Sequence, residues 1–131
     1  MKFLYLIEWL FTPARDRERL REKYRLRVEY FKSRDRVLRS MGSPRDWLQR
    51  RVTVADAEAA HMHAVPRCGA DPVPFGYLHR DWVRLLSRMR EGDELWEYDS
   101  PPETWGYLCG RAGYAVVRQG KVVAVLETEM N

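Results

Sequence analysis

The stretch GYAVVRQGKVVAVLET, Gly113–Thr128, decides the fold class. Two apolar segments with a period of two, typical of strands, are separated here by Gln119 and Gly120. A two-residue hairpin loop favours glycine in its second place, because both central residues need a positive φ. We therefore predict a β-hairpin in which Arg118 lies opposite Lys121.

An unbroken register in that hairpin places Val116 opposite Val123 and Ala115 opposite Ala124. Both faces of the two strands are then apolar, and a sheet this small needs cover on each side. We expect helices to cover one face. The opening segment or another protein is expected to cover the other.

Two shorter elements are predicted just before the hairpin. The sequence ELWEY, residues 94–98, is typical of a strand, and PETWGYLCG, residues 102–110, is typical of a short helix that ends at Gly110. We therefore expect a C-terminal antiparallel sheet of about three strands within residues 93–131.

The remaining residues, 1–92, are predicted to form four or five helices. The longest spans residues 13–39 and begins at Thr12 and Pro13, because threonine is a favourable N-cap and proline fits the first helical position. Its apolar side chains recur at helical spacing. They are Leu20, Tyr24, Val28, Phe31 and Leu38.

Further helices are predicted to start at Ser43 and at Thr53 and to cover residues 77–92. Residues 65–76 contain three prolines and two glycines, so we expect a loop without regular structure there.

The opening segment, MKFLYLIEWLF, is apolar on nearly every side. If it is a helix, it must be enclosed by the rest of the fold or by a second chain; a strand over Phe3–Ile7 is the alternative. It is too short to cross a membrane, which takes about 20 residues, and Glu8 interrupts it. We expect no membrane partner.

Length and composition indicate one folded domain. The chain has 131 residues, of which 45% are hydrophobic and 12% aromatic, so it can build a core. The predicted fold is a single α+β domain, residues 1–131, in which the helical part packs on the small sheet.

The net charge of +4 is unevenly distributed. Residues 1–60 contain 15 basic and 9 acidic side chains, whereas residues 61–131 contain 8 basic and 10 acidic ones. Between Glu91 and Gly110 there are six acidic residues and no basic one. This part of the surface would repel a nucleic-acid backbone.

No motif assigns a reaction. Cys68 and Cys109 are too few for a disulfide framework, so we expect both to be reduced in the cytoplasm. Neither has the sequence context of a catalytic cysteine. On the helix expected there, His61 and His63 point in nearly opposite directions and cannot hold one metal ion. We predict no enzyme activity, catalytic residue, metal or cofactor.

The acidic run alternates with aromatic residues, a composition typical of protein interfaces. We predict a cytoplasmic protein-binding module, of the immunity or inhibitor type, that covers a basic partner such as a nuclease toxin. The predicted contact residues are Glu94, Trp96, Glu97, Tyr98, Asp99, Glu103, Trp105 and Arg111.

The alternative is a nucleic-acid-binding regulator that uses the arginine-rich helix 13–39. Such binding weakens steeply as salt concentration rises. We rank nucleic-acid binding below protein binding, because the arginines are spread around the helix. The sequence does not decide whether the chain forms a homodimer. The residues of the nucleic-acid alternative are Arg15, Arg17, Arg21, Arg25 and Arg27.

The pattern W..L.GRAG.A.VR.GKVV....T.MN, read from Trp105 to Asn131, resembles the ending of a group of small bacterial proteins of uncharacterised function. The resemblance covers about a fifth of the chain. It implies a bacterial origin and a shared hairpin, and it transfers no catalytic residue.

Overall fold

The computed structural model describes residues 2–66, 69 and 71–131. The chain forms two compact units, Met1–Ser40 and Met41–Asn131, and each is described by itself. The predicted α+β class is confirmed, with helices along the first part of the chain and an antiparallel sheet toward its end.

The first unit is a pair of helices joined by a short turn. Helix α1 (Lys2–Phe11) and helix α2 (Arg17–Ser40) flank the 3-10 turn η1 (Ala14–Asp16). The opening segment is therefore a helix and not a strand. No described helix is both long enough and apolar enough to cross a membrane.

The two helices meet through aromatic and polar side chains. The rings of Tyr5 and Tyr24 pack edge to face at 4.9 Å, and the Tyr24 hydroxyl donates a hydrogen bond to Glu8 Oε2. Arg17 lies 4.1 Å from the Trp9 ring centroid. Thr12, predicted to begin the second helix, instead donates its hydroxyl hydrogen to the Glu8 carbonyl at the end of α1.

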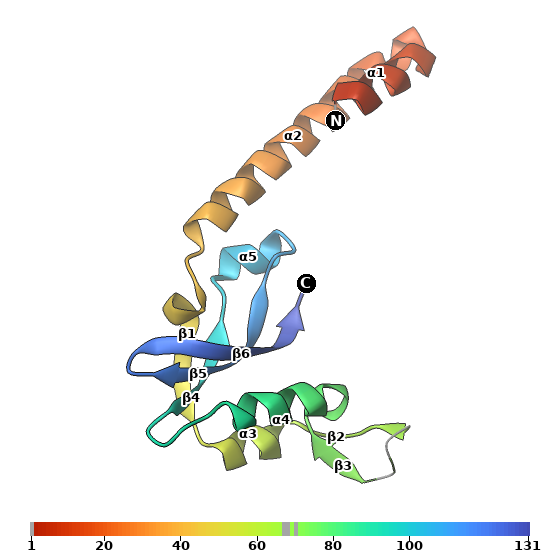
Figure 1. Ribbon diagram of the computed structural model, residues 1–131. Helices are drawn as coiled ribbons and strands as arrows, with labels where there is room; N and C mark the ends of the chain where they lie inside the picture. The colour runs from red at the N-terminus through yellow and green to blue at the C-terminus, as the bar shows by residue number, and fades with distance from the viewer. Residues whose placement is uncertain (1, 67–68, 70) are drawn as a thin grey trace. The chain divides into compact units, whose positions relative to one another are not determined.

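The second unit is built on a four-stranded antiparallel sheet in the order β1-β4-β5-β6. Helices α3 (Val54–Ala60) and α4 (His79–Ser87) cover one face of this sheet. A separate ribbon of two strands, β2 (Met62–Ala64) and β3 (Pro72–Pro74), lies beside them (Figure 1). The sheet strands are β1 (Leu48–Val52), β4 (Glu94–Asp99), β5 (Arg111–Arg118) and β6 (Lys121–Met130).

The main core lies between the sheet and these two helices. Trp82 of α4 (His79–Ser87) is fully buried, and its ring packs on Phe75 and Tyr114. Ala57 of α3 (Val54–Ala60) and Leu95 of β4 close the cluster. A smaller cluster on the opposite face joins Trp47, Tyr98 and Ala115.

The hairpin turn is confirmed, but its register is not. Gln119 and Gly120 have φ of 49° and 76°, and Arg118 pairs with Lys121 as predicted. The register then shifts, so that Val116 pairs with Ala124 and not with Val123. This bulge turns Ala124 and Leu126 toward the helices, onto the face of Val116 and Tyr114.

The helix predicted from Ser43 is wrong beyond its first turn. Ser43 and Asp46 form a capping box, which gives the backbone amides at the start of the single 3-10 turn η2 (Pro44–Trp47) their hydrogen-bond partners. Residues Leu48–Val52 then leave the turn as strand β1 and pair with β4. The sheet accordingly has four strands where about three were expected.

Helix α3 starts as predicted, with the Thr53 hydroxyl accepting the Asp56 amide, but it ends at Ala60. Strands β2 (Met62–Ala64) and β3 (Pro72–Pro74) form the ribbon, so part of the expected loop is a regular element. Two prolines fit there because a two-stranded ribbon leaves half of its amides without a strand partner. The 3-10 turn η4 (Gly76–Leu78) leads into α4, which stops at Ser87.

Helix α5 (Pro102–Gly106) is shorter than the nine residues expected, and it connects β4 to β5. Its first turn is fixed by hydroxyl groups. Ser100 and Thr104 share a hydrogen bond of 2.6 Å, and the Ser100 Oγ accepts the Arg111 amide.

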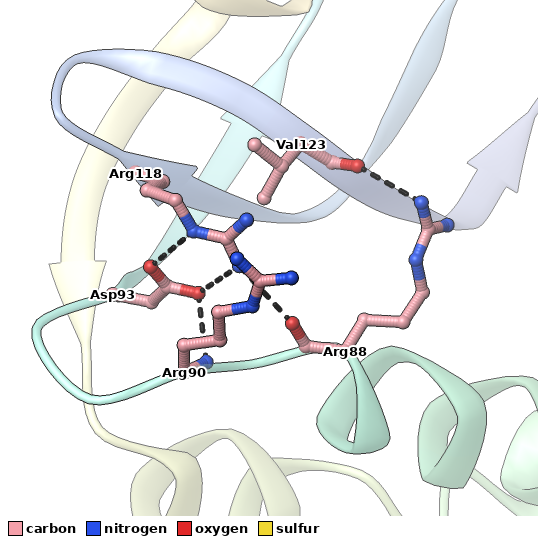
Figure 2. A network of polar contacts seen from close by, with 5 residues as sticks. All are labelled: Arg88, Arg90, Asp93, Arg118 and Val123. Carbon is pink, nitrogen blue, oxygen red and sulfur yellow. Dashed lines mark hydrogen bonds and ion pairs between the residues drawn. The ribbon is translucent and has the colours of Figure 1, made fainter.

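An ion pair connects the loop after α4 to the end of the β5-β6 hairpin (Figure 2). Both Asp93 carboxylate oxygens accept from Arg118, at 2.9 and 2.8 Å, and one also accepts the Arg90 amide. The Arg118 guanidinium donates further to the Arg88 carbonyl, and Arg88 donates to the Val123 carbonyl. The Asp93 side chain is 2% exposed. These contacts lower the pKa of Asp93 to about 2, and the hydrogen bonds from Arg118 have the largest effect.

We expect Asp93→Asn to lower the thermal midpoint at pH 7 by roughly 5–15 °C, because it leaves Arg118 without its charge partner. The folded pKa of Asp93 lies below the value of about 4 expected for an unfolded chain, so its contribution is present above pH 4 and is lost as the pH falls toward 2. Melting curves of both proteins from pH 7 to pH 2 measure this; the two should converge at the acid end. Asp81→Asn, which breaks the exposed pair with Arg84, is the control and should change little.

Candidate protein-binding site

Strand β1 neutralises two of the three acids of β4, Glu94 and Glu97. Arg51 lies 3.1 Å from Glu94, and Arg50 lies 2.9 Å from Glu97. The register of the two strands brings these pairs together, with Arg50 opposite Glu97. The prediction of an acidic surface without basic partners is therefore wrong for Glu94 and Glu97, because the arginines that pair with them are distant in sequence.

The predicted aromatic residues divide between core and surface. Tyr98 is 2% exposed and packs on Trp47, so it belongs to the smaller core cluster. Burial raises the pKa of its hydroxyl to about 12. Trp96 is half-buried, and its Nε1 donates to Glu94 across 2.9 Å. Trp105 is half-buried in helix α5, beyond the C-terminal end of β4.

At that end lies a groove of about 410 Å³ between η2 and the segment that follows β4. We call it the Trp47–Trp105 groove. It combines two indole rings, two prolines and two carboxylates. Its lining residues are Asp46, Trp47, Gln49, Asp99, Ser100, Pro101, Pro102 and Trp105.

The chain holds Trp105 in place from several directions. Its Nε1 donates to Asp99 Oδ1 at 2.8 Å, and its carbonyl accepts the Asn131 side-chain amide at 2.9 Å. The indole lies directly over Gly110, where any Cβ would overlap the ring. Asn131 also accepts the Gly110 amide. The orientation of the Trp105 ring is therefore fixed by contacts within the chain itself.

The two acids that line the groove, Asp46 and Asp99, form no ion pair among the described residues. The exposed Asp99 side chain accepts a hydrogen bond from Trp105. Glu103 is exposed in the first turn of α5 but does not line the groove. Asp46 accepts from the Ser43 amide and hydroxyl, and these bonds lower its pKa. The lining of the groove therefore carries a net negative charge, in contrast to Glu94 and Glu97, which are paired with arginines.

The sequence predicted Asp99 and Trp105 of the groove but not Asp46 and Trp47; the predicted contact residue Glu103 does not line it. The signal that could have found the missing half is the capping box before Trp47, which suits a short turn as well as a long helix. Arg111 stands at the start of β5 and pairs with Glu127 at 3.1 Å, and it does not line the groove.

Three of the five arginines of the nucleic-acid alternative already contact other residues of the first unit. Arg15 pairs with Asp16 and Arg25 with Glu22, while Arg17 packs on the Trp9 ring. Arg21 and Arg27 are exposed, and neither has an ion pair among the described residues.

The histidine and cysteine candidates do not assemble a site within the described residues, which contain no cluster of metal-ligating side chains. His61 caps α3 and hydrogen-bonds the Tyr114 hydroxyl at 2.9 Å, while His63 lies in β2 and not on a helix. Cys109 donates its thiol hydrogen to the Thr104 carbonyl. Cys68 lies outside the described residues.

Comparisons of the chain with models of protein families, with curated proteins and with solved structures found no match. The resemblance of residues 105–131 to small bacterial proteins stays a prediction.

Proposed function

We propose that this chain is a protein-binding module that holds a basic side chain of its partner in the Trp47–Trp105 groove. The supporting observation is that two exposed carboxylates, which form no ion pair among the described residues, lie beside a fixed indole ring. A lysine or arginine gains both an ion pair and a cation–π contact in such a place. A protein partner supplies that side chain on a larger complementary surface.

We further propose a role in the bacterial cytoplasm of the immunity or inhibitor type, in which binding covers a basic surface of the partner. The charge of the second unit supports this, since residues 41–131 contain 11 basic and 13 acidic side chains. An acidic surface speeds the encounter with a basic protein. The nucleic-acid alternative ranks lower, because three of its five arginines already have partners.

The groove can be tested with N-acetyl-argininamide as probe. We expect it to shift the amide and indole N–H resonances of Trp105 in a ¹⁵N-correlated NMR titration, while N-acetyl-norleucinamide leaves them in place. Asp99→Asn should weaken the binding about 5-fold to 20-fold, because it removes the charge but keeps an acceptor for the indole.

Glu129→Gln removes an exposed carboxylate that does not line the groove and serves as the matched control. Its affinity for the probe should equal that of the unchanged protein. The proposal fails if both variants weaken binding equally, or if arginine and norleucine probes bind alike.

A further inference from the structure

Helix α1 has an unusual distribution of side chains. The residues that contact α2 include its polar and aromatic members, Tyr5, Glu8 and Trp9. The remaining apolar residues of α1 stay largely exposed within the first unit. They are Phe3, Leu4, Leu6, Ile7, Leu10 and Phe11, each 40% to 84% exposed. A contiguous apolar face of this kind marks an interaction surface.

The charge of the same unit is strongly positive. Residues 1–40 contain 12 basic and 6 acidic side chains, a net charge of +6. Several exposed or half-exposed basic residues of α2 have no ion pair among the described residues. They are Arg19, Arg21, Arg27, Lys32, Arg34, Arg36 and Arg39.

These two features together select the kind of surface that covers α1. A second copy of the chain could cover the apolar residues, but it would bring another unit of net charge +6 into contact with the first. Nucleic acid would satisfy the arginines and leave the apolar face in water. A lipid surface with anionic headgroups satisfies both, because acyl chains take up apolar side chains and headgroups attract the basic ones.

We propose that residues 1–40 bind the surface of an anionic lipid membrane, with the six apolar residues of α1 inserted at its interface. Helix α1 has ten residues, which suits a helix lying in the plane of the membrane and is too short for a span. This inference departs from our expectation of no membrane partner, which considered only crossing segments. It does not depend on the Trp47–Trp105 groove.

The test is co-sedimentation of the full chain with lipid vesicles. We expect binding about 10-fold or more stronger to vesicles of phosphatidylcholine and phosphatidylglycerol, mixed about seven to three, than to phosphatidylcholine alone. Raising the salt concentration from about 50 mM to about 500 mM should weaken this binding, because salt screens the headgroup charge.

Leu10→Glu should lower the binding about 10-fold, because it places a charge on the inserted face. Val83→Glu is the matched control, since Val83 is 49% exposed on α4 of the other unit, and it should bind as the unchanged protein does. Both sites are exposed, so circular dichroism melting should confirm that both variants fold.

Three outcomes overturn the proposal. They are the absence of binding to both vesicle types, equal binding to both, and equal loss in the two variants. Light scattering tests the alternative, a homodimer. If the chain binds no vesicles and forms a dimer that Leu10→Glu converts to a monomer, the apolar face binds a second copy. Binding of duplex DNA without binding of vesicles assigns the arginines to nucleic acid.

Discussion

We expect the Gly113→Ala protein to lose about 3 kcal/mol or more of its free energy of unfolding. Gly113 is buried in β5, where the register against β6 shifts between Ala112 and Gly113. A methyl group there would overlap the Leu126 carbonyl oxygen and lie 3.0 Å from the Thr128 amide nitrogen. Both are backbone atoms of a paired strand, so no side-chain rotation relieves the overlap.

Gly106→Ala is the matched control, because a methyl group at this position of α5 meets nothing within 4 Å. Alanine favours a helix over glycine, so this variant should be as stable as the unchanged protein or slightly more stable. Urea unfolding followed by circular dichroism measures both variants. Equal stability of the two alanine variants would show that β5 and β6 do not pair as described at Gly113.

The hairpin shows which part of this fold the sequence determines locally. The turn at Gln119 and Gly120 could be predicted because its backbone needs a positive φ, a requirement that glycine meets. The bulge between Val116 and Val117 could not, because valine and alanine on either side fit both faces of a strand. Packing against α4 selects the register that buries Ala124 and Leu126.

The largest difference between the predicted and the observed fold is strand β1, where a helix was expected, and it alters which acidic residues are paired at the candidate site. The sequence from Ser43 to Trp47 contains helix-start signals, and a single 3-10 turn uses all of them. The strand that follows is stabilised by pairing with β4, about 50 residues later, which no local pattern reveals. The pairing of Arg50 and Arg51 with the acidic residues of β4 could therefore not be predicted from the sequence.

The same distance in sequence explains why only half of the groove was predicted. Asp99 and Trp105 lie in the acidic and aromatic stretch that composition identified, and they meet each other through a local hydrogen bond. Trp47 reaches them only because β1 and β4 are neighbours in the sheet. Residues contributed by a single segment are visible in the sequence, whereas residues contributed by strand pairing are not.

We expect Trp82→Ala to lower the free energy of unfolding by about 3–5 kcal/mol, the largest loss from any single side chain in this core. Trp82 is fully buried, contacts the rings of Phe75 and Tyr114, and donates its indole hydrogen to Glu58 at 2.9 Å. It thereby connects α4, α3 and the sheet. Tyr77→Ala is the control, since Tyr77 is 79% exposed and its removal should change the stability by less than about 0.5 kcal/mol.

Trp82→Phe separates the two contributions of this side chain, because it keeps an aromatic ring in the core and removes the indole donor to Glu58. We expect a loss of about 1–3 kcal/mol, between the losses of the alanine variant and the control. Urea unfolding at pH 7 measures all three variants. If Trp82→Ala unfolds at the same urea concentration as Tyr77→Ala, helix α4 does not pack on the sheet through Trp82, and the main core must lie elsewhere.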